Sequence, residues 1–166
     1  MNLEVVASRA ERPGMAASAV SSYAVAARGQ LDDVITMADA LLSMARRIPE
    51  PVDLGPLVRR MKALLAPAAK ADGRALEIEG PFEQLGTTSA DGNTVRYAIG
   101  SLLLAATQAS RHVRCEPVTE GEEPTLRIET CDGAAIPCDG GLIAAAAESR
   151  IRIQAETSAI SISFPR

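Results

Sequence analysis

The sequence has few aromatic side chains and no tryptophan. Among its 166 residues, two Phe and two Tyr are the only large aromatic side chains. Since 47% of the residues are nevertheless hydrophobic, we expect a core built mainly from alanine and branched aliphatic side chains. The length is enough for one ordinary domain with a helical appendage.

Long runs of like charge and long runs of apolar residues are also lacking. The formal net charge of −4 is spread without a block of either sign, which disfavours nucleic acid or an anionic membrane as a partner. No stretch reaches the roughly 18 consecutive apolar residues that a membrane span needs. The N-terminus carries no signal-peptide pattern, so we expect a cytoplasmic protein.

Cysteine and histidine are scarce. Cys115, Cys131 and Cys138 include no CxxC pair, which favours reduced, inert thiols over disulfides or a metal site. His112 is the only histidine, and we interpret it as a residue at the end of a helix or the start of a strand. A Ser-His-Asp or Cys-His catalytic group is therefore not indicated.

A heptad-like apolar seam predicts a long helix over residues 20–47. Apolar residues recur three and four apart at Leu31, Val34, Ala38, Leu41 and Ala45. Such a seam fits packing between helices of one chain, and it equally fits a homodimer interface.

After residue 50, helical patterns alternate with pairs of strands. Asp53 and Asp91 are candidate N-caps of two helices, and "LIAAAAESR" is a third helix. Alternating apolar residues predict strands at "ALEIEG", "EQLGTTS", "HVRCEPV", "TLRIETC", "IRIQAE" and "AISISF". We expect an α+β fold in which a layer of helices covers a mostly antiparallel sheet.

Several strings in this order resemble the core of bacterial sensor histidine kinases. LL-x-x-A-R followed by P-V-D-L is similar to the end of the second hairpin helix and its linker, and "ADGNTVRYAIGSLLLAATQA" is similar to the N-box segment. "GGLIAAAAESRIRIQAETSAISISFP" looks like the glycine-leucine helix start and the last two strands. The resemblance covers roughly residues 28–165. It implies a partial dimerisation hairpin over residues 1–50 and an α/β sandwich of the Bergerat (GHKL) ATPase type over residues 51–166.

The departures from this family concern its chemistry. The resemblance places Ser101 and Ala105, which share one helical face, at the positions of the two N-box asparagines that help to hold magnesium. Magnesium demands hard oxygen ligands, of which alanine offers none and serine one weak hydroxyl. Residues 1–50 contain no histidine, so the usual phosphate acceptor is missing as well.

This sequence matches the other nucleotide-binding residues of the family only in part. Asp132 in "CDGAAIP" stands where an aspartate recognises adenine, and Gly140 and Gly141 are left as a phosphate-contacting turn. The loop that folds over ATP is essentially absent. We therefore expect a vestigial nucleotide pocket at Ser101, Asp132, Gly140 and Gly141, with ATP and magnesium disfavoured as cofactors.

Plainer interpretations stay open for each of these residues. Ser101 and Ala105 also fit an ordinary helix packed on a sheet, Asp132 fits a solvated turn, and Gly140-Gly141 fits a simple turn before a helix.

The favoured hypothesis is a non-catalytic histidine-kinase-like signalling module of bacterial two-component signalling. It forms a homodimer through residues 20–47, or binds a histidine kinase or response regulator there. One alternative is a nucleotide-binding histidine kinase core with a reduced pocket. The other is a histidine phosphotransfer protein with His112 as carrier.

Overall fold

The computed structural model describes residues 17–45, 51–118 and 121–166. The chain divides into two compact units, residues 1–39 and 40–166. Helix α2 (Ala17–Ala45) confirms the predicted long helix, although its expected end at residues 46 and 47 lies outside the described residues. The proposed domain boundary at residue 50 stays a prediction.

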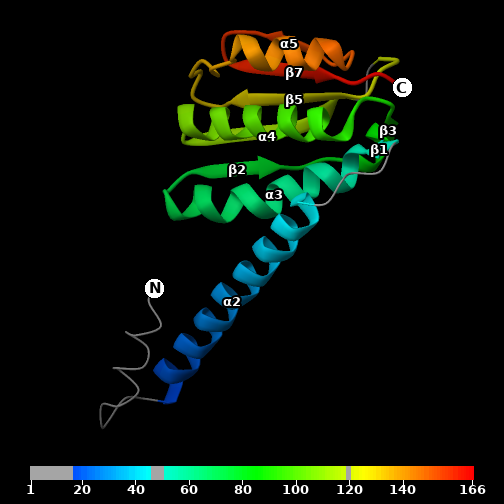
Figure 1. Ribbon diagram of the computed structural model, residues 1–166. Helices are drawn as coiled ribbons and strands as arrows, with labels where there is room; N and C mark the ends of the chain where they lie inside the picture. Colours follow the sequence, from blue (N-terminus) through cyan, green and yellow to red (C-terminus); the bar gives the residue numbers. More distant parts are fainter. Residues whose placement is uncertain (1–16, 46–50, 119–120) are drawn as a thin grey trace. The chain divides into compact units, whose positions relative to one another are not determined.

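The second unit is a five-stranded sheet with three helices on one face (Figure 1). The helices are α3 (Leu54–Ala71), α4 (Gly92–Ala109) and α5 (Gly140–Glu148). In spatial order the strands are β2 (Ala75–Ile78), β4 (His112–Val118), β5 (Thr125–Thr130), β7 (Ala159–Ser163) and β6 (Arg152–Ala155). Among the described strands of this sheet, only the β2–β4 pair is parallel, so the expected α+β fold with a mostly antiparallel sheet is confirmed.

The core lies between the sheet and the helices. Leu126 and Ile128 of β5 pair with Ile162 and Ile160 of β7, and all four side chains are completely buried. Helix α4 meets them with a buried apolar face that includes Ile99, Leu102 and Leu103. Strands β2 and β5 bury every second residue because their side chains alternate between the two faces of the sheet.

The other face of the sheet carries charged residues in complementary rows. Glu77, Arg114 and Glu129 are cross-strand neighbours on β2, β4 and β5. In the next row, Arg127 is the neighbour of Glu116, and its Nη2 lies 3.0 Å from Glu156 Oε2. Opposite charges on facing positions stabilise a solvated face by a few tenths of a kcal/mol to about 1 kcal/mol per pair.

The predicted strand at "EQLGTTS" is only partly correct. Its first half is a 3-10 helix, η1 (Phe82–Leu85), and only Thr87–Thr88 form a strand, β3, which pairs with β1 (Val52–Asp53) outside the main sheet. Phe82 and Leu85 are both buried, and a spacing of three residues brings them to one side of a 3-10 turn. Gly86, with φ of +68°, then turns the chain into β3.

Three helices of the second unit begin after an aspartate, but only two aspartates cap through their side chains. Asp53 accepts a hydrogen bond from Gly55 N at 3.2 Å, and Asp91 Oδ1 accepts from Thr94 N at 2.8 Å. Asp139 precedes α5 without a side-chain cap bond to any described residue. Helix α3 also continues through Pro67 to Ala71 before the expected Asp72-Gly73 turn.

Replacing Asp91 with alanine should destabilise the protein by about 1 kcal/mol, because the first turn of α4 loses its cap. The free energy of unfolding in urea measures this loss. Asp139→Ala is the matched control and should cost less, since only a charge near the helix N-terminus is removed. Equal losses in the two variants would contradict the role of the Asp91 cap.

Candidate functional site

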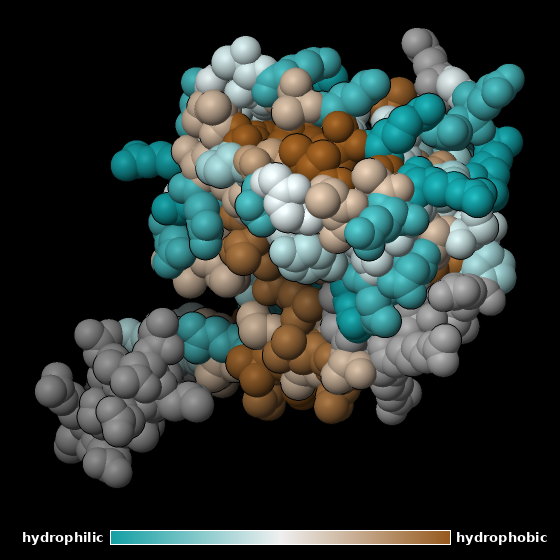
Figure 2. All heavy atoms as spheres, turned by 45° about the horizontal axis from the view of Figure 1, so that its top comes forward, coloured by the Kyte–Doolittle hydropathy of each residue, from teal (hydrophilic) through white to brown (hydrophobic). Residues whose placement is uncertain are grey.

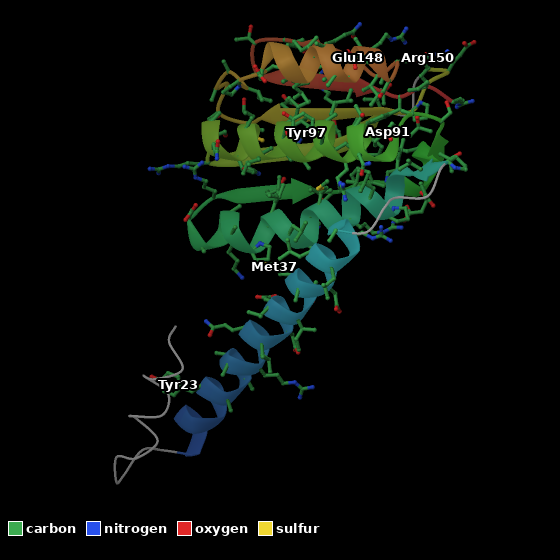
Figure 3. All side chains as sticks on the ribbon, in the orientation of Figure 1. Tyr23, Met37, Asp91, Tyr97, Glu148 and Arg150 are labelled. Carbon is green, nitrogen blue, oxygen red and sulfur yellow. The ribbon has the colours of Figure 1, made fainter. Side chains whose placement is uncertain are left out.

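An open hollow of about 560 Å³ lies on the surface of α4. Its lining consists of Met61 from α3 and of Asn93, Arg96, Tyr97, Gly100, Ser101 and Leu104 from α4. Tyr97 and Leu104 are 52% and 46% exposed, which is unusual for large apolar side chains on a helix that packs on a sheet. Figure 3 shows Tyr97 on α4, with Asp91 at the start of the same helix.

Arg96 is the residue in this hollow that the sequence analysis missed. Its Nη2 donates a hydrogen bond to Asn93 Oδ1 at 2.8 Å. Its Nη1 is buried and has no hydrogen-bond partner among the described residues. A buried guanidinium nitrogen without a partner is costly. The spacing of Asn93, Arg96 and Gly100 by three and four residues was the available signal, because it places them on one helical face.

Ser101 and Ala105 occupy different environments despite their spacing of four residues. Ser101 lines the hollow and is half-buried. Ala105 packs against the hydrophobic core. The space beside Ser101 is therefore open, and its polar groups come from Asn93 and Arg96 as well as from Ser101.

Asp132 lies in the turn after β5, at the end of the sheet where α4 finishes. Its Oδ1 accepts a hydrogen bond from Ala134 N at 3.2 Å, and Gly133 between them has φ of +76°. The neighbouring Ser110 side chain, together with the hydrogen bond from Ala134 N, holds the pKa of Asp132 below its usual range. The Ser110 hydroxyl also lies 2.9 Å from the carbonyl oxygen of His112. The carboxylate thus organises its own turn.

The residues that were predicted to form a nucleotide pocket do not line one common hollow. Asp132 lies beside Ser110, which follows Ser101 by nine residues. Nine residues span about 13 Å along a helix axis at about 1.5 Å per residue. The hollow that contains Ser101 is not lined by Asp132, Gly140 or Gly141.

Gly140 and Gly141 form the exposed first two positions of α5. A Cβ added to Gly141 would lie 3.0 Å from Asp139 Oδ2. A carboxylate therefore stands beside the free N–H groups of this helix start. Its negative charge opposes the binding of a phosphate there.

His112 begins β4, as the sequence predicted, and faces Glu77. Its Nε2 lies 2.9 Å from Glu77 Oε1, although the alignment does not make a good hydrogen bond. Arg114 approaches the other carboxylate oxygen of Glu77 at 3.8 Å. His112 is thus a member of the charged rows on the outer face of the sheet.

All three cysteines are free thiols, as expected. Burial, and to a lesser extent the charge of Glu116, raises the pKa of Cys115 to about 12. Cys115 is therefore inert at neutral pH, whereas Cys131 is exposed. Within residues 17–45, 51–118 and 121–166, no group of three His, Cys, Asp or Glu side chains is placed to hold a metal ion.

Comparison with known proteins finds likeness in structure alone. No model of a protein family matches the sequence, and no curated protein matches it. The histidine kinase AdeS of Acinetobacter baumannii is 12% identical, with a TM-score of 0.48 over 89% of this chain and 82% of AdeS.

A second solved structure is full-length ShkA in complex with AMPPNP. It is 17% identical, with a TM-score of 0.46 over 87% of this chain and 38% of ShkA. The chain thus spans about two fifths of the length of ShkA. In the described part of the chain, no helix combines the length and the apolar character needed to cross a membrane.

Removal of the Ser110 hydroxyl should raise the pKa of Asp132 towards its ordinary value. The lowered pKa means that the stability from these hydrogen bonds is present at neutral pH and is lost as the pH falls through the folded-state pKa. A carbon-13 NMR titration of the Asp132 carboxyl in Ser110→Ala measures the change. Ser89→Ala, which removes a hydroxyl that donates to Arg166 O, is the control. A pKa unmoved by Ser110→Ala would refute the assigned cause.

Proposed function

We propose that this protein is a non-catalytic, histidine-kinase-like signalling module that acts through protein–protein interaction in bacterial two-component signalling. In this proposal two copies associate through α2, and a histidine kinase or response regulator is the further partner. The sequence resemblance to the sensor histidine kinase core gives the signalling context. The exposed apolar seam of α2 is the observation that carries the proposal.

Helix α2 presents large apolar side chains to solvent. Six of them are between 50% and 69% exposed, namely Val25, Leu31, Val34, Ile35, Leu41 and Leu42. Figure 2 shows hydrophobic atoms at the surface of this helix. Soluble proteins rarely expose contiguous apolar patches of this kind unless another surface covers them.

The seam has the periodicity of a helix–helix interface. Leu31, Val34, Ala38 and Leu41 follow the three-and-four spacing, and Ile35 and Leu42 widen the same stripe. Each copy would bury this stripe against the same stripe of its partner, as a two-fold interface requires. Burial of these apolar side chains on association would stabilise the pair, at about 25 cal/mol per Å² of apolar surface removed from water.

The chemistry of phosphate transfer lacks its usual groups. A phosphoramidate on a hairpin helix needs an imidazole, and residues 1–50 contain none. Ser101 and Ala105 offer one hydroxyl between them where magnesium needs hard oxygen ligands. The carboxylate of Asp139 beside Gly141 further disfavours a phosphate at the start of α5.

A nucleotide-binding core is the second candidate, and one observation favours it. Arg96 lines the hollow beside Ser101, and its positive charge would attract an anion there. A histidine phosphotransfer role for His112 is less favoured. That side chain stands opposite Glu77 on a sheet, and a carboxylate repels an incoming phosphoryl group.

Charges introduced on the seam should separate the copies. The double variant Val34→Asp, Leu41→Asp places two carboxylates seven residues apart on the interface, where burial of their charge is prohibitive. Light scattering after size exclusion should give the mass of two chains for the wild type and of one chain for the variant.

Thr36→Asp is the matched control, because Thr36 is exposed on α2 but lies off the seam. It should leave the mass at two chains. A wild-type mass of one chain at high micromolar concentration would refute the homodimer, and so would a double variant that keeps two chains.

Calorimetric titration with ATP and magnesium should show no binding at micromolar affinity. Micromolar binding would refute the non-catalytic proposal and favour the second candidate. In that case Arg96→Leu should weaken binding at least tenfold, since a charge-assisted hydrogen bond to phosphate is lost. Asp132→Asn should abolish it if that carboxylate recognises the adenine, and Asp72→Asn is a control in a turn remote from the hollow.

A further inference from the structure

Strand β6 forms one edge of the sheet. Among the described strands it pairs only with β7, so one side of its backbone has no strand partner. The opposite edge differs, because Lys62 Nζ donates a hydrogen bond to the Ile78 carbonyl oxygen of β2 at 3.1 Å. A charged side chain that covers an edge blocks the addition of another strand, and an uncovered edge permits it.

A hollow of about 620 Å³ follows β6 and the neighbouring helix α5. Ile143 and Ala147 of α5 and Ile153 of β6 form its apolar part, and Ile143 is 43% exposed. Ile153 is the cross-strand neighbour of the buried Ile162, so it stands on the core side of the sheet. A strand added beside β6 would direct every second side chain into this hollow.

The rim of the same hollow is positively charged. Arg150, Arg152 and Glu123 line it, and Arg152 forms an ion pair with Glu123. Among the charged residues that line the hollow, Arg150 is then the surplus charge. An incoming segment with carboxylates at alternate positions would therefore complement this rim while its apolar residues filled the hollow.

Arg150 occupies a backbone position that normally belongs to glycine. Its N donates to Ala147 O at 3.0 Å and Ile151 N donates to Ala146 O at 2.9 Å, which is the Schellman pattern at the end of a helix. The φ of Arg150 is +59°, a conformation that L side chains rarely adopt. Figure 3 shows Arg150 at this end of α5, near Glu148.

We propose that the β6 edge binds an extended segment of a partner protein in which apolar and acidic residues alternate, and that this segment adds to the sheet as a further strand. Backbone hydrogen bonds to β6 would supply affinity, the hollow would select the apolar residues, and Arg150 would select the acidic ones. The proposal does not depend on dimerisation through α2 or on the loss of nucleotide binding.

The test uses the chain of 166 residues labelled with nitrogen-15 and an eight-residue peptide of alternating Glu and Val with blocked ends. At millimolar peptide we expect shifts concentrated in the amides of Arg152–Ala155 and slower hydrogen exchange of those amides. A peptide with Lys in place of Glu should bind at least fivefold more weakly. Methylation of alternate backbone nitrogens should also weaken binding, since it removes the donors of one peptide edge.

Arg150→Gly removes the charge while suiting the backbone, so the variant should fold and bind the Glu peptide about three- to fivefold more weakly. Arg150→Lys should retain most of the affinity. Arg114→Gln, on β4 away from this edge, is the matched control and should leave it unchanged.

Three outcomes would overturn the proposal. The first is an absence of shifts at Arg152–Ala155, which would mark β6 as a protected edge. The second is equal binding of the Lys peptide, which would mean unselective apolar contact. The third is concentration-dependent shifts of the same amides without peptide, because a second copy would then occupy the edge.

Discussion

The structure of residues 40–166 depends on the contact between α4 and the inner face of the sheet. Ile99, Leu102 and Leu103 lie completely buried against a sheet face that contributes Leu126, Ile128 and their partners on β7. Since the core contains so few aromatic side chains, close packing of aliphatic residues must supply most of its stability. The helix is therefore held by one face, and its other face is free to form the hollow around Arg96.

The same layered architecture determines where function can reside. One face of the sheet packs in the core, and the other carries rows of opposite charges. The surfaces that remain for recognition are those of the helices and the edges of the sheet. The exposed seam of α2, the Arg96 hollow and the β6 edge are three such surfaces.

The regular elements were predictable because their signals are local. The caps at Asp53 and Asp91 and the alternation in β4, β5 and β7 depend on neighbours within a few residues. The first residues of "EQLGTTS" were mistaken for a strand because short segments fit either period until burial decides between them. Arg96 was missed since nothing in the sequence says that its guanidinium nitrogen is buried without a partner.

By itself, the sequence determined which chemistry is available: one histidine outside the long helix, serine and alanine four residues apart in the segment at 95–110, and an apolar seam of heptad spacing. The tertiary structure alone decided which side chains meet. It separated Asp132 from the hollow of Ser101, set Asp139 beside Gly141 and left β6 at an edge. The physical reason is that residue type and periodicity are properties of the chain, whereas burial, electrostatic neighbours and unpaired edges exist only after distant segments have packed together.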